Sequence, residues 1–375
     1  MKFKLLSSQL VLCTFLPPKD MRRPNVECGK FSAPLCYSDV CTAPESVNKT
    51  IKVFVKRFPA SDPETATNIW ISGRNFQTME HIAYMLHYEL NETVNVYLMD
   101  ARGSGKSTVF DCGMTTNDPS FDYSIDPAQV ESCAFDLESK FGDPAAFSPT
   151  SAAHDLFNLI SKLSNGANTF VYDTGYFTSD PSDKSFEMLY NLIVFSELWE
   201  RPTPSMAELR KRFTDSVAGG GIYTGVPAYC AFSKEQSKVC DKYNFGKYEA
   251  REIIYKRDRY WNASITIPSQ ASVLVLSSKM DISAPYKYTK RLFESLTGTN
   301  KELITFETGS GATLFSTHPQ LRFQSADTCG LKIIASYIFM GGVLDKLDKS
   351  CMDEMPTFEM IPSDFNEANF TNKLN

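Results

Sequence analysis

The sequence predicts an α/β fold, in which a mainly parallel sheet is flanked by helices, and three observations support this. Short apolar, β-branched segments alternate with segments whose apolar residues recur at helical spacing. Helices of ordinary length between strands imply right-handed βαβ units, whose strands run parallel. The chain has 375 residues, 42% of them hydrophobic and 27 of them phenylalanine, which is enough for one large α/β domain or two ordinary ones.

Six segments have the composition of buried strands, and six have the periodicity of helices. The predicted strands are Ile51–Phe58, Asn68–Ser72, Val94–Met99, Thr169–Asp173, Ser272–Ser277 and Glu302–Glu307. The predicted helices are Met79–Leu90, Ala152–Leu163, Phe186–Trp199, Met206–Thr214, Tyr286–Leu296 and Leu331–Phe339. In the second helix, apolar positions from Leu156 to Leu163 repeat at helical spacing behind Ser151, which we expect to be the N-cap.

The alternation of strands and helices divides the chain into parts. We expect a signal peptide at residues 1–18, because a basic start precedes an apolar stretch, although Ser7, Ser8 and Gln9 interrupt it and no small-residue cleavage site follows. Residues 28–180 form the N-terminal part of the core. Residues 181–265 break the alternation with helical, aromatic and polar sequence and are expected to be a cap-like insertion. Residues 266–360 complete the core, and residues 361–375 form a tail.

The cysteines and glycosylation sequons favour a secreted protein. Several of the ten cysteines stand at loop-closing separations, and none forms a CxxC pair with histidines at zinc spacing, so we expect disulfides rather than a metal. Reduced, buried cysteines in the cytosol are the alternative. Loss of Cys13 with the leader would leave an unpaired cysteine among Cys28, Cys36 and Cys41. The candidate pairs are Cys112 with Cys133, Cys230 with Cys240, and Cys329 with Cys351, and the sequons are at Asn48, Asn91, Asn262 and Asn369.

Charge and hydropathy exclude several classes of partner. The net charge is −6 and basic residues are scattered, so neither nucleic acid nor an anionic membrane is expected to bind. No run of about eighteen apolar residues exists to span a bilayer. No cofactor is expected, and the remaining class of partner is a protein or peptide ligand that the sequence does not identify.

The segment DARGSGKST after the strand Val94–Met99 resembles a phosphate-binding P-loop. Gly105, Lys106 and Ser107 match the end of that motif, but the position of its first glycine is Asp100. An aspartate there would place negative charge beside the phosphates, so we do not expect a nucleotide.

The segments that follow the strands resemble a family of α/β hydrolases. The matching stretches are VNVYLMDARGSGKST, SAAHDLFNLISKLSNGANTFVY, PSQASVLVLSSKMDISAPYKYTK, ETGSGATLF and TCGLKIIASYI…LDKSC. They are similar to the secreted serine peptidases of the tripeptidyl aminopeptidase and prolyl aminopeptidase type. The resemblance implies the α/β-hydrolase fold and a Ser-Asp-His triad. It also makes Asp100, Arg102, Gly103, Gly105 and Ser107 parts of a D-x-R-G-x-G-x-S loop that serves a tight strand-to-helix connection.

The catalytic positions of that family are altered in this chain. The serine of the G-x-S-Y-G-T turn aligns with Gly175, which is followed by Tyr176. The histidine of the A-T-H-G-T-L segment aligns with Gly311. The acid aligns with Asp281, which without a histidine is better interpreted as a turn or helix-cap aspartate before Pro285.

The oxyanion loop is also changed. The family's G-G-P-G stretch aligns with ISGRNFQTME, which keeps only Gly73. With nucleophile and base both lost, the sequence predicts a pseudoenzyme with a binding or decoy role. The alternative is a serine exopeptidase or hydrolase with a rearranged site, built from His318 with Thr174 or a nearby serine; His318 stands seven residues beyond the expected place. The other three histidines, His81, His87 and His154, are expected to be surface or packing residues.

The chain is shorter than the fold requires. Between the nucleophile turn and Ser272 no apolar strand is found, so a core strand and much of the cap are missing. Three explanations are open: Ser272–Ser277 pairs with Thr169–Asp173, the protein folds poorly, or the gene is decayed or mis-spliced.

Overall fold

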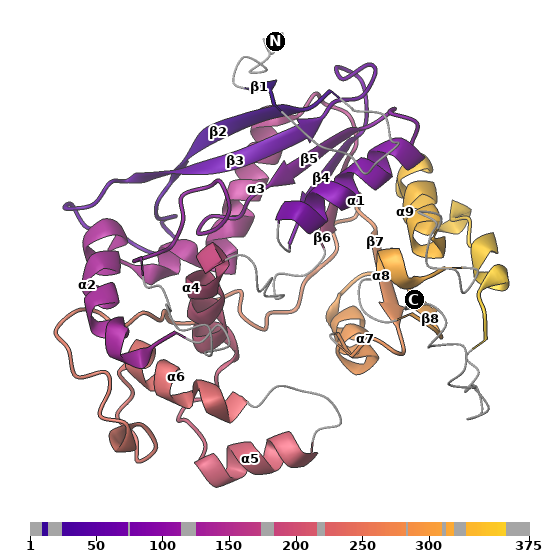
Figure 1. Ribbon diagram of the computed structural model, residues 1–375. Helices are drawn as coiled ribbons and strands as arrows, with labels where there is room; N and C mark the ends of the chain where they lie inside the picture. Colours follow the sequence, from indigo (N-terminus) through magenta and orange to yellow (C-terminus); the bar gives the residue numbers. More distant parts are fainter. Residues whose placement is uncertain are drawn as a thin grey trace, which may run out of the picture. The chain divides into compact units, whose positions relative to one another are not determined.

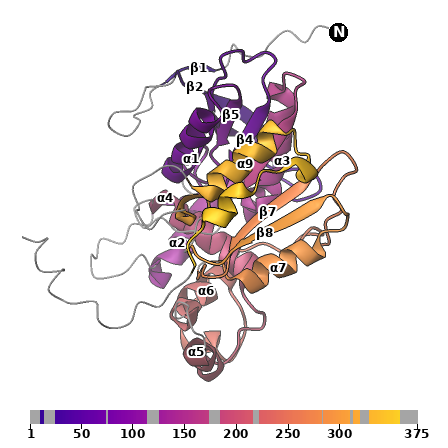
Figure 2. The same cartoon turned by 90° about the vertical axis from the view of Figure 1, so that its right-hand side faces the viewer.

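The computed structural model consists of two units, Met1–Ala263 and Ser264–Asn375 (Figures 1 and 2). It describes residues 10–13, 25–73, 76–113, 125–173, 184–215, 222–282, 284–309, 313–318 and 328–357. Each unit has its own sheet and its own apolar core.

The first unit contains a six-stranded mixed sheet with the order β1-β2-β3-β5-β4-β6. Its strands are β1 (Val11–Leu12), β2 (Glu27–Pro34), β3 (Thr50–Phe58), β4 (Asn68–Ser72), β5 (Asn95–Met99) and β6 (Thr169–Asp173). The last three run parallel to one another, whereas β1, β2 and β3 pair antiparallel, and so do β3 and β5. The expected mainly parallel sheet is therefore a mixed one, because β2 and β3 form an antiparallel pair joined by a loop and not by a helical crossover.

Helices cover both faces of this sheet. α1 (Phe76–Glu89) and α3 (Pro149–Leu163) lie on opposite faces, as the two views show. The other helices are α2 (Val130–Phe141), α4 (Lys184–Ile193) with the π-helical turn Val194–Leu198, α5 (Met206–Asp215) and α6 (Val226–Ser233). Short 3₁₀ helices cover Pro127–Gln129, Pro144–Phe147, Ile222–Gly225 and Cys240–Lys242.

The expected insertion shares the core of the first unit. Trp199 stacks on Tyr229 with ring centroids 4.5 Å apart, and Phe195 packs edge-on against both. These rings belong to the same buried cluster as Phe147 and Val130, which lie N-terminal to β6. Aromatic side chains bury large apolar areas, so this part of the chain is held to the unit by its core.

The second unit is built on two parallel strands, β7 (Val273–Ser278) and β8 (Lys301–Phe306). Its helices are α7 (Tyr286–Ser295), α8 (Thr313–Ser316) and α9 (Cys329–Phe339), followed by the 3₁₀ turns Leu344–Lys346 and Ser350–Glu354. Ile304 and Phe306 of β8 pack against Ile333 of α9. The pairing of Ser272–Ser277 with Thr169–Asp173, one of the three explanations left open, is not observed: β7 pairs with β8 in a separate sheet. No strand lies between Asp173 and Val273 in the residues described there.

Five strands and helices of the described residues were missed, and one cap was assigned to the wrong residue. β2 reads ECGKFSAP, whose Gly, Ser and Pro have low strand propensity, and it forms because β3 offers it a partner. β1, α2, α6 and α8 were also absent from the prediction. The N-cap of α3 is Ser148, whose Oγ accepts from the Ser151 amide at 3.2 Å. Pro149 occupies the first helical position, which holds Ser148 extended, so the helix starts before Ser151.

All ten cysteines lie in the described residues and all are paired. The three pairs expected from spacing are disulfides, and so are Cys13–Cys28 and Cys36–Cys41. Cys13–Cys28 holds β1 against β2. With Cys13 present, no cysteine of this chain is left without a partner.

A fully buried ion pair joins four segments of the first unit. The Arg102 guanidinium donates to both carboxylate oxygens of Asp155 in α3, each at 2.7 Å. Its remaining donors reach the carbonyls of Pro34, Leu35 and Ala146 at 2.6–3.0 Å. All five donors of the guanidinium are therefore satisfied, which is the condition for burying a charge without a large cost.

We predict that Arg102→Lys destabilises the protein by about 3–5 kcal/mol, because an ammonium cannot reproduce the fork and would leave buried carbonyls and a buried carboxylate short of donors. The free energy of unfolding from urea titration measures this. Arg212→Lys is the matched control: Arg212 makes exposed ion pairs with Glu200 and Glu208, and its replacement is expected to cost under about 0.5 kcal/mol. Equal costs at the two positions would contradict the prediction.

Candidate functional site

The loops expected to carry chemistry in the first unit start at the carboxyl ends of β4, β5 and β6. Ser72 and Asp173 are register partners at the ends of β4 and β6, and the Ser72 hydroxyl donates to Asp173 Oδ1 at 2.9 Å. Gly73, the retained glycine of the oxyanion loop, follows with φ 121°, a conformation that favours glycine. The nucleophile position Gly175 and its neighbours Thr174 and Tyr176 lie outside the described residues. The strands that precede the positions aligned with the oxyanion loop and the nucleophile turn, β4 and β6, are therefore neighbours in the sheet.

The D-x-R-G-x-G-x-S loop after β5 is a closed turn. Asp100 Oδ2 accepts from the Lys106 amide at 2.7 Å, and the Ser107 hydroxyl donates to the Asp100 carbonyl at 2.7 Å. Gly103 and Gly105 have φ of 91° and 57°, and a Cβ on Gly105 would collide with the Asp100 carboxylate. The loop does not lead directly into a helix as expected; it closes through a bridge between Gly103 and Val109.

The amides of this loop are already used within it. Gly103 N donates to Thr108 O, Ser104 N to Ala101 O and Ser107 N to Ser104 O. A phosphate cradle needs such amides to point at the anion. Phosphate would have to displace these bonds and approach the Asp100 carboxylate, so the geometry gives no support to nucleotide binding.

In the second unit, the loops after β7 and β8 meet. The Ser278 hydroxyl donates to the Gly309 carbonyl at 2.5 Å, so the acid segment and the segment aligned with the histidine lie side by side. Asp281 Oδ1 accepts from the Ala284 amide at 2.9 Å in the turn before α7. Gly311 lies outside the described residues. Among the described residues, the turn that holds Asp281 and the residue Gly309 thus lie at the same end of the two-stranded sheet.

The histidines of the first unit have structural partners. His87 in α1 is 4% exposed, and its Nε2 donates to the Pro59 carbonyl at 3.0 Å. His154 in α3 stacks on Tyr37 and lies 3.3 Å from Asp39 Oδ2. In the second unit, His318 lies two residues beyond the end of α8 (Thr313–Ser316).

A polar cluster around Tyr37 was not predicted. Its hydroxyl donates to Asp155 Oδ1 at 2.7 Å and accepts from Asn158 Nδ2 at 3.1 Å. Burial, and then the charge of Asp155, raise the pKa of Tyr37 to about 12. The signal that would have revealed it is the apolar face of α3 interrupted by a buried aspartate.

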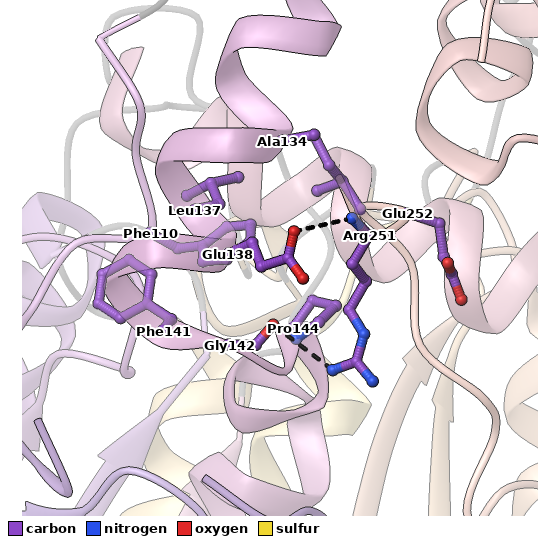
Figure 3. A pocket seen from close by; sticks show the side chains of 10 residues that line it. Phe110, Ala134, Leu137, Glu138, Phe141, Gly142, Pro144, Arg251 and Glu252 are labelled. Carbon is purple, nitrogen blue, oxygen red and sulfur yellow. Dashed lines mark hydrogen bonds between the residues drawn. The ribbon is translucent and has the colours of Figure 1, made fainter. Parts of the chain in front are cut away.

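A crevice and a groove lie among the described residues of the first unit. The crevice of Figure 3 lies where Glu138 of α2 accepts from the Arg251 amide at 3.0 Å. Its volume of about 10 Å³ has room for about one water, so it is a packing seam. A groove of about 200 Å³ lies between β2 and α3, beside Tyr37, Asn158 and Lys162. The groove is lined by Pro34, Tyr37 and Asp155, which also contact Arg102 in the loop after β5.

In the described part of the chain, no cluster of three or more His, Cys, Asp or Glu side chains could hold a metal ion. Within the same residues, no helix is both long and apolar enough to cross a membrane.

The order of motifs on the strands decides the fold. The D-x-R-G-x-G-x-S loop follows β5, the nucleophile position follows β6, the acid follows β7 and the histidine position follows β8. This is the chain order of nucleophile, acid and base in α/β hydrolases, and the sheets are flanked by helices. The chain has an α/β-hydrolase fold.

Comparison with known proteins returned solved structures only; no protein-family model and no curated protein matches the chain. A hydrolase from Agrobacterium vitis S4 is 13% identical with a TM-score of 0.37, over 85% of this chain and 99% of that one. An esterase from an Arctic intertidal metagenomic library is 10% identical with a TM-score of 0.32, over 89% and 100%. The mouse α/β hydrolase domain-containing protein 10 is 10% identical with a TM-score of 0.35, over 77% and 93%. At these TM-scores we base the fold on motif and strand order alone.

We predict that His87 makes the protein less stable in mild acid. Burial lowers the pKa of His87, so the folded protein keeps it neutral. The unfolded chain takes up this proton below about pH 6.5, so the stabilisation is present above that pH and is lost as the pH falls through the folded pKa. His87→Gln keeps a donor for the Pro59 carbonyl and should flatten the fall in unfolding free energy between about pH 6.5 and pH 5. An unchanged slope in this variant would contradict the prediction.

Proposed function

We propose that this chain is a secreted glycoprotein of the serine-peptidase-like kind that has lost hydrolytic activity and serves as a binding or decoy module for a protein or peptide. The observation that carries the proposal is glycine at both the nucleophile position, Gly175, and the base position, Gly311. Glycine supplies neither a hydroxyl to attack a carbonyl nor an imidazole to accept the proton.

The size of the loss makes residual activity negligible. In a worked triad, removing the nucleophile or the histidine alone lowers kcat about a millionfold, and the remaining catalysis comes from the oxyanion hole and substrate binding. Here the oxyanion loop keeps only Gly73 of its glycines. Covalent acyl transfer needs nucleophile, base and charge stabilisation together.

The contacts of His87, His154 and Asp281 also support the loss of hydrolytic activity. His87 and His154 are occupied by the Pro59 carbonyl and the Asp39 carboxylate. Asp281 accepts from the amide of Ala284, as an aspartate that stabilises a turn does. Each of these side chains therefore has a structural role that does not depend on catalysis.

Disulfides and sequons support secretion. The four disulfides outside residues 1–18 are consistent with an oxidising compartment, since cytosolic proteins seldom keep them. Cleavage of the expected leader would remove Cys13 and leave Cys28 without the partner that it has here. Asn48, Asn91 and Asn262 are exposed, as glycosylation requires, while Asn369 lies outside the described residues.

We predict that the purified protein neither reacts with a fluorophosphonate probe nor hydrolyses aminoacyl or tripeptidyl substrates above the buffer rate. An active serine peptidase labelled in parallel is the positive control. Asp281→Asn is the matched variant: a pseudoenzyme shows no difference between it and the parent protein.

A rearranged exopeptidase would give the opposite result. Labelling or turnover that Thr174→Ala or His318→Ala abolishes would replace the proposal with the enzymatic alternative. Activity that both variants retain, but that co-purifies with the folded protein, would equally overturn the loss of function.

A further inference from the structure

The loop Arg257–Asn262 at the end of the first unit presents two anchored aromatic rings. Trp261 is 43% exposed and Tyr260 is 47% exposed. Trp261 Nε1 donates to the Glu197 carbonyl at 3.1 Å, and the Arg257 guanidinium lies 4.1 Å from the indole centroid. The Tyr260 hydroxyl accepts from Arg259 at 2.6 Å, and Arg259 lies over the tyrosine ring at 4.8 Å. Both rings are held in place by these contacts, while more than two fifths of the surface of each residue is exposed.

Asn262 of the sequon Asn262-Ala263-Ser264 follows these rings directly in a tight turn. The Ala263 amide donates to the Tyr260 carbonyl at 3.1 Å, which closes the turn over Trp261 and Asn262. Asn262 has φ 55°, the left-handed conformation that asparagine tolerates at such a turn position. Its side chain is exposed and makes no hydrogen bond to any other described residue.

We propose that Asn262 is N-glycosylated and that its first N-acetylglucosamine packs on the exposed aromatic surface formed by Tyr260 and Trp261. The inference rests on the proposed secretion of the chain. One face of a pyranose ring carries C–H groups and is apolar, so it removes ring surface from water when it lies on an aromatic side chain. Because the glycan is covalently attached one residue after Trp261, it reaches this surface without any loss of translational freedom.

The modification itself is a balanced transfer from a polyprenyl-diphosphate-linked oligosaccharide. A bond forms between Asn262 Nδ2 and C1 of the first sugar, and the bond from that C1 to the diphosphate breaks. The lipid diphosphate leaves, and one amide proton is released. Transfer needs only the sequon in an accessible chain, whereas the packing on Tyr260 and Trp261 requires the folded loop.

The other two described sequons lack this surface. Asn48 is preceded by Ser46 and Val47, and its Oδ1 accepts from the amide and the hydroxyl of Thr50. Asn91 has φ 53° and follows Tyr88 by three residues. The Tyr88 ring stacks toward Tyr84, with centroids 6.4 Å apart, because side chains on a helix lean toward its N-terminus. Its ring therefore points away from Asn91.

The test is a double-mutant cycle on the full chain secreted from a eukaryotic host. Ser264→Ala removes the sequon and leaves Asn262 in place; Tyr260→Ala and Trp261→Ala each remove a ring. Peptide mass spectrometry reports occupancy of Asn262, and thermal melting reports stability. We expect Ser264→Ala to lower Tm by about 2 °C in the parent protein and to have no further effect in the ring variants.

Two controls separate packing from the bulk of the glycan. When the glycan is trimmed to a single N-acetylglucosamine, the parent protein should still melt at a higher temperature than the Ser264→Ala variant, since the first sugar makes the contact. Thr50→Ala, which removes the sequon at Asn48, should shift Tm by the same amount whether or not Tyr260 is present. Tyr260→Ala keeps the test available where Trp261→Ala fails to fold, because of the two rings only Trp261 bonds to the Glu197 backbone, whereas the Tyr260 hydroxyl bonds to the exposed side chains of Arg259 and Asp39.

The outcomes distinguish this inference from the secretion on which it rests. Occupied Asn48 or Asn91 with an empty Asn262 overturns the inference and leaves secretion standing. The inference is also overturned if Asn262 is glycosylated but Ser264→Ala lowers Tm by the same amount with and without the aromatic rings. Absence of glycan at every sequon overturns both.

Discussion

The buried pair of Arg102 and Asp155 is the contact on which the first unit depends. Arg102 comes from the loop after β5, Asp155 from α3, and the guanidinium also binds carbonyls at the end of β2 and in the 3₁₀ helix before α3. Tyr37 closes the cluster by donating to Asp155, and the Arg102 guanidinium lies over its ring. A guanidinium buried away from solvent must have all its N–H groups hydrogen-bonded. The four segments that supply its partners can therefore adopt only one mutual arrangement.

The loop after β5 is held by structural contacts of its own. Asp100 binds the Lys106 amide, Ser107 binds the Phe54 amide, and Gly105 leaves space for the Asp100 carboxylate. These contacts stabilise the fold, so the residues of this loop are required whether or not the chain is catalytic.

Each of the two sheets forms its strand pairs within its own unit. β7 pairs with β8, and α9 covers this pair through Ile333, with the Cys329–Cys351 disulfide in the same cluster. In the first unit β6 pairs with β4. Each unit therefore has an apolar core of its own.

The sequence by itself determined the α/β class, all six predicted strands to within one residue at either end, the three disulfides expected from spacing and the glycines at Gly175 and Gly311. These are local properties, because composition, periodicity and the spacing of residues can be read directly from the sequence. Only the tertiary structure decided that β2 is a strand, that Ser148 and not Ser151 caps α3, that β7 forms a second sheet, and that Asp155 neutralises Arg102. Each of these depends on a partner distant in sequence, or for Ser148 on backbone geometry, so no local pattern could specify it.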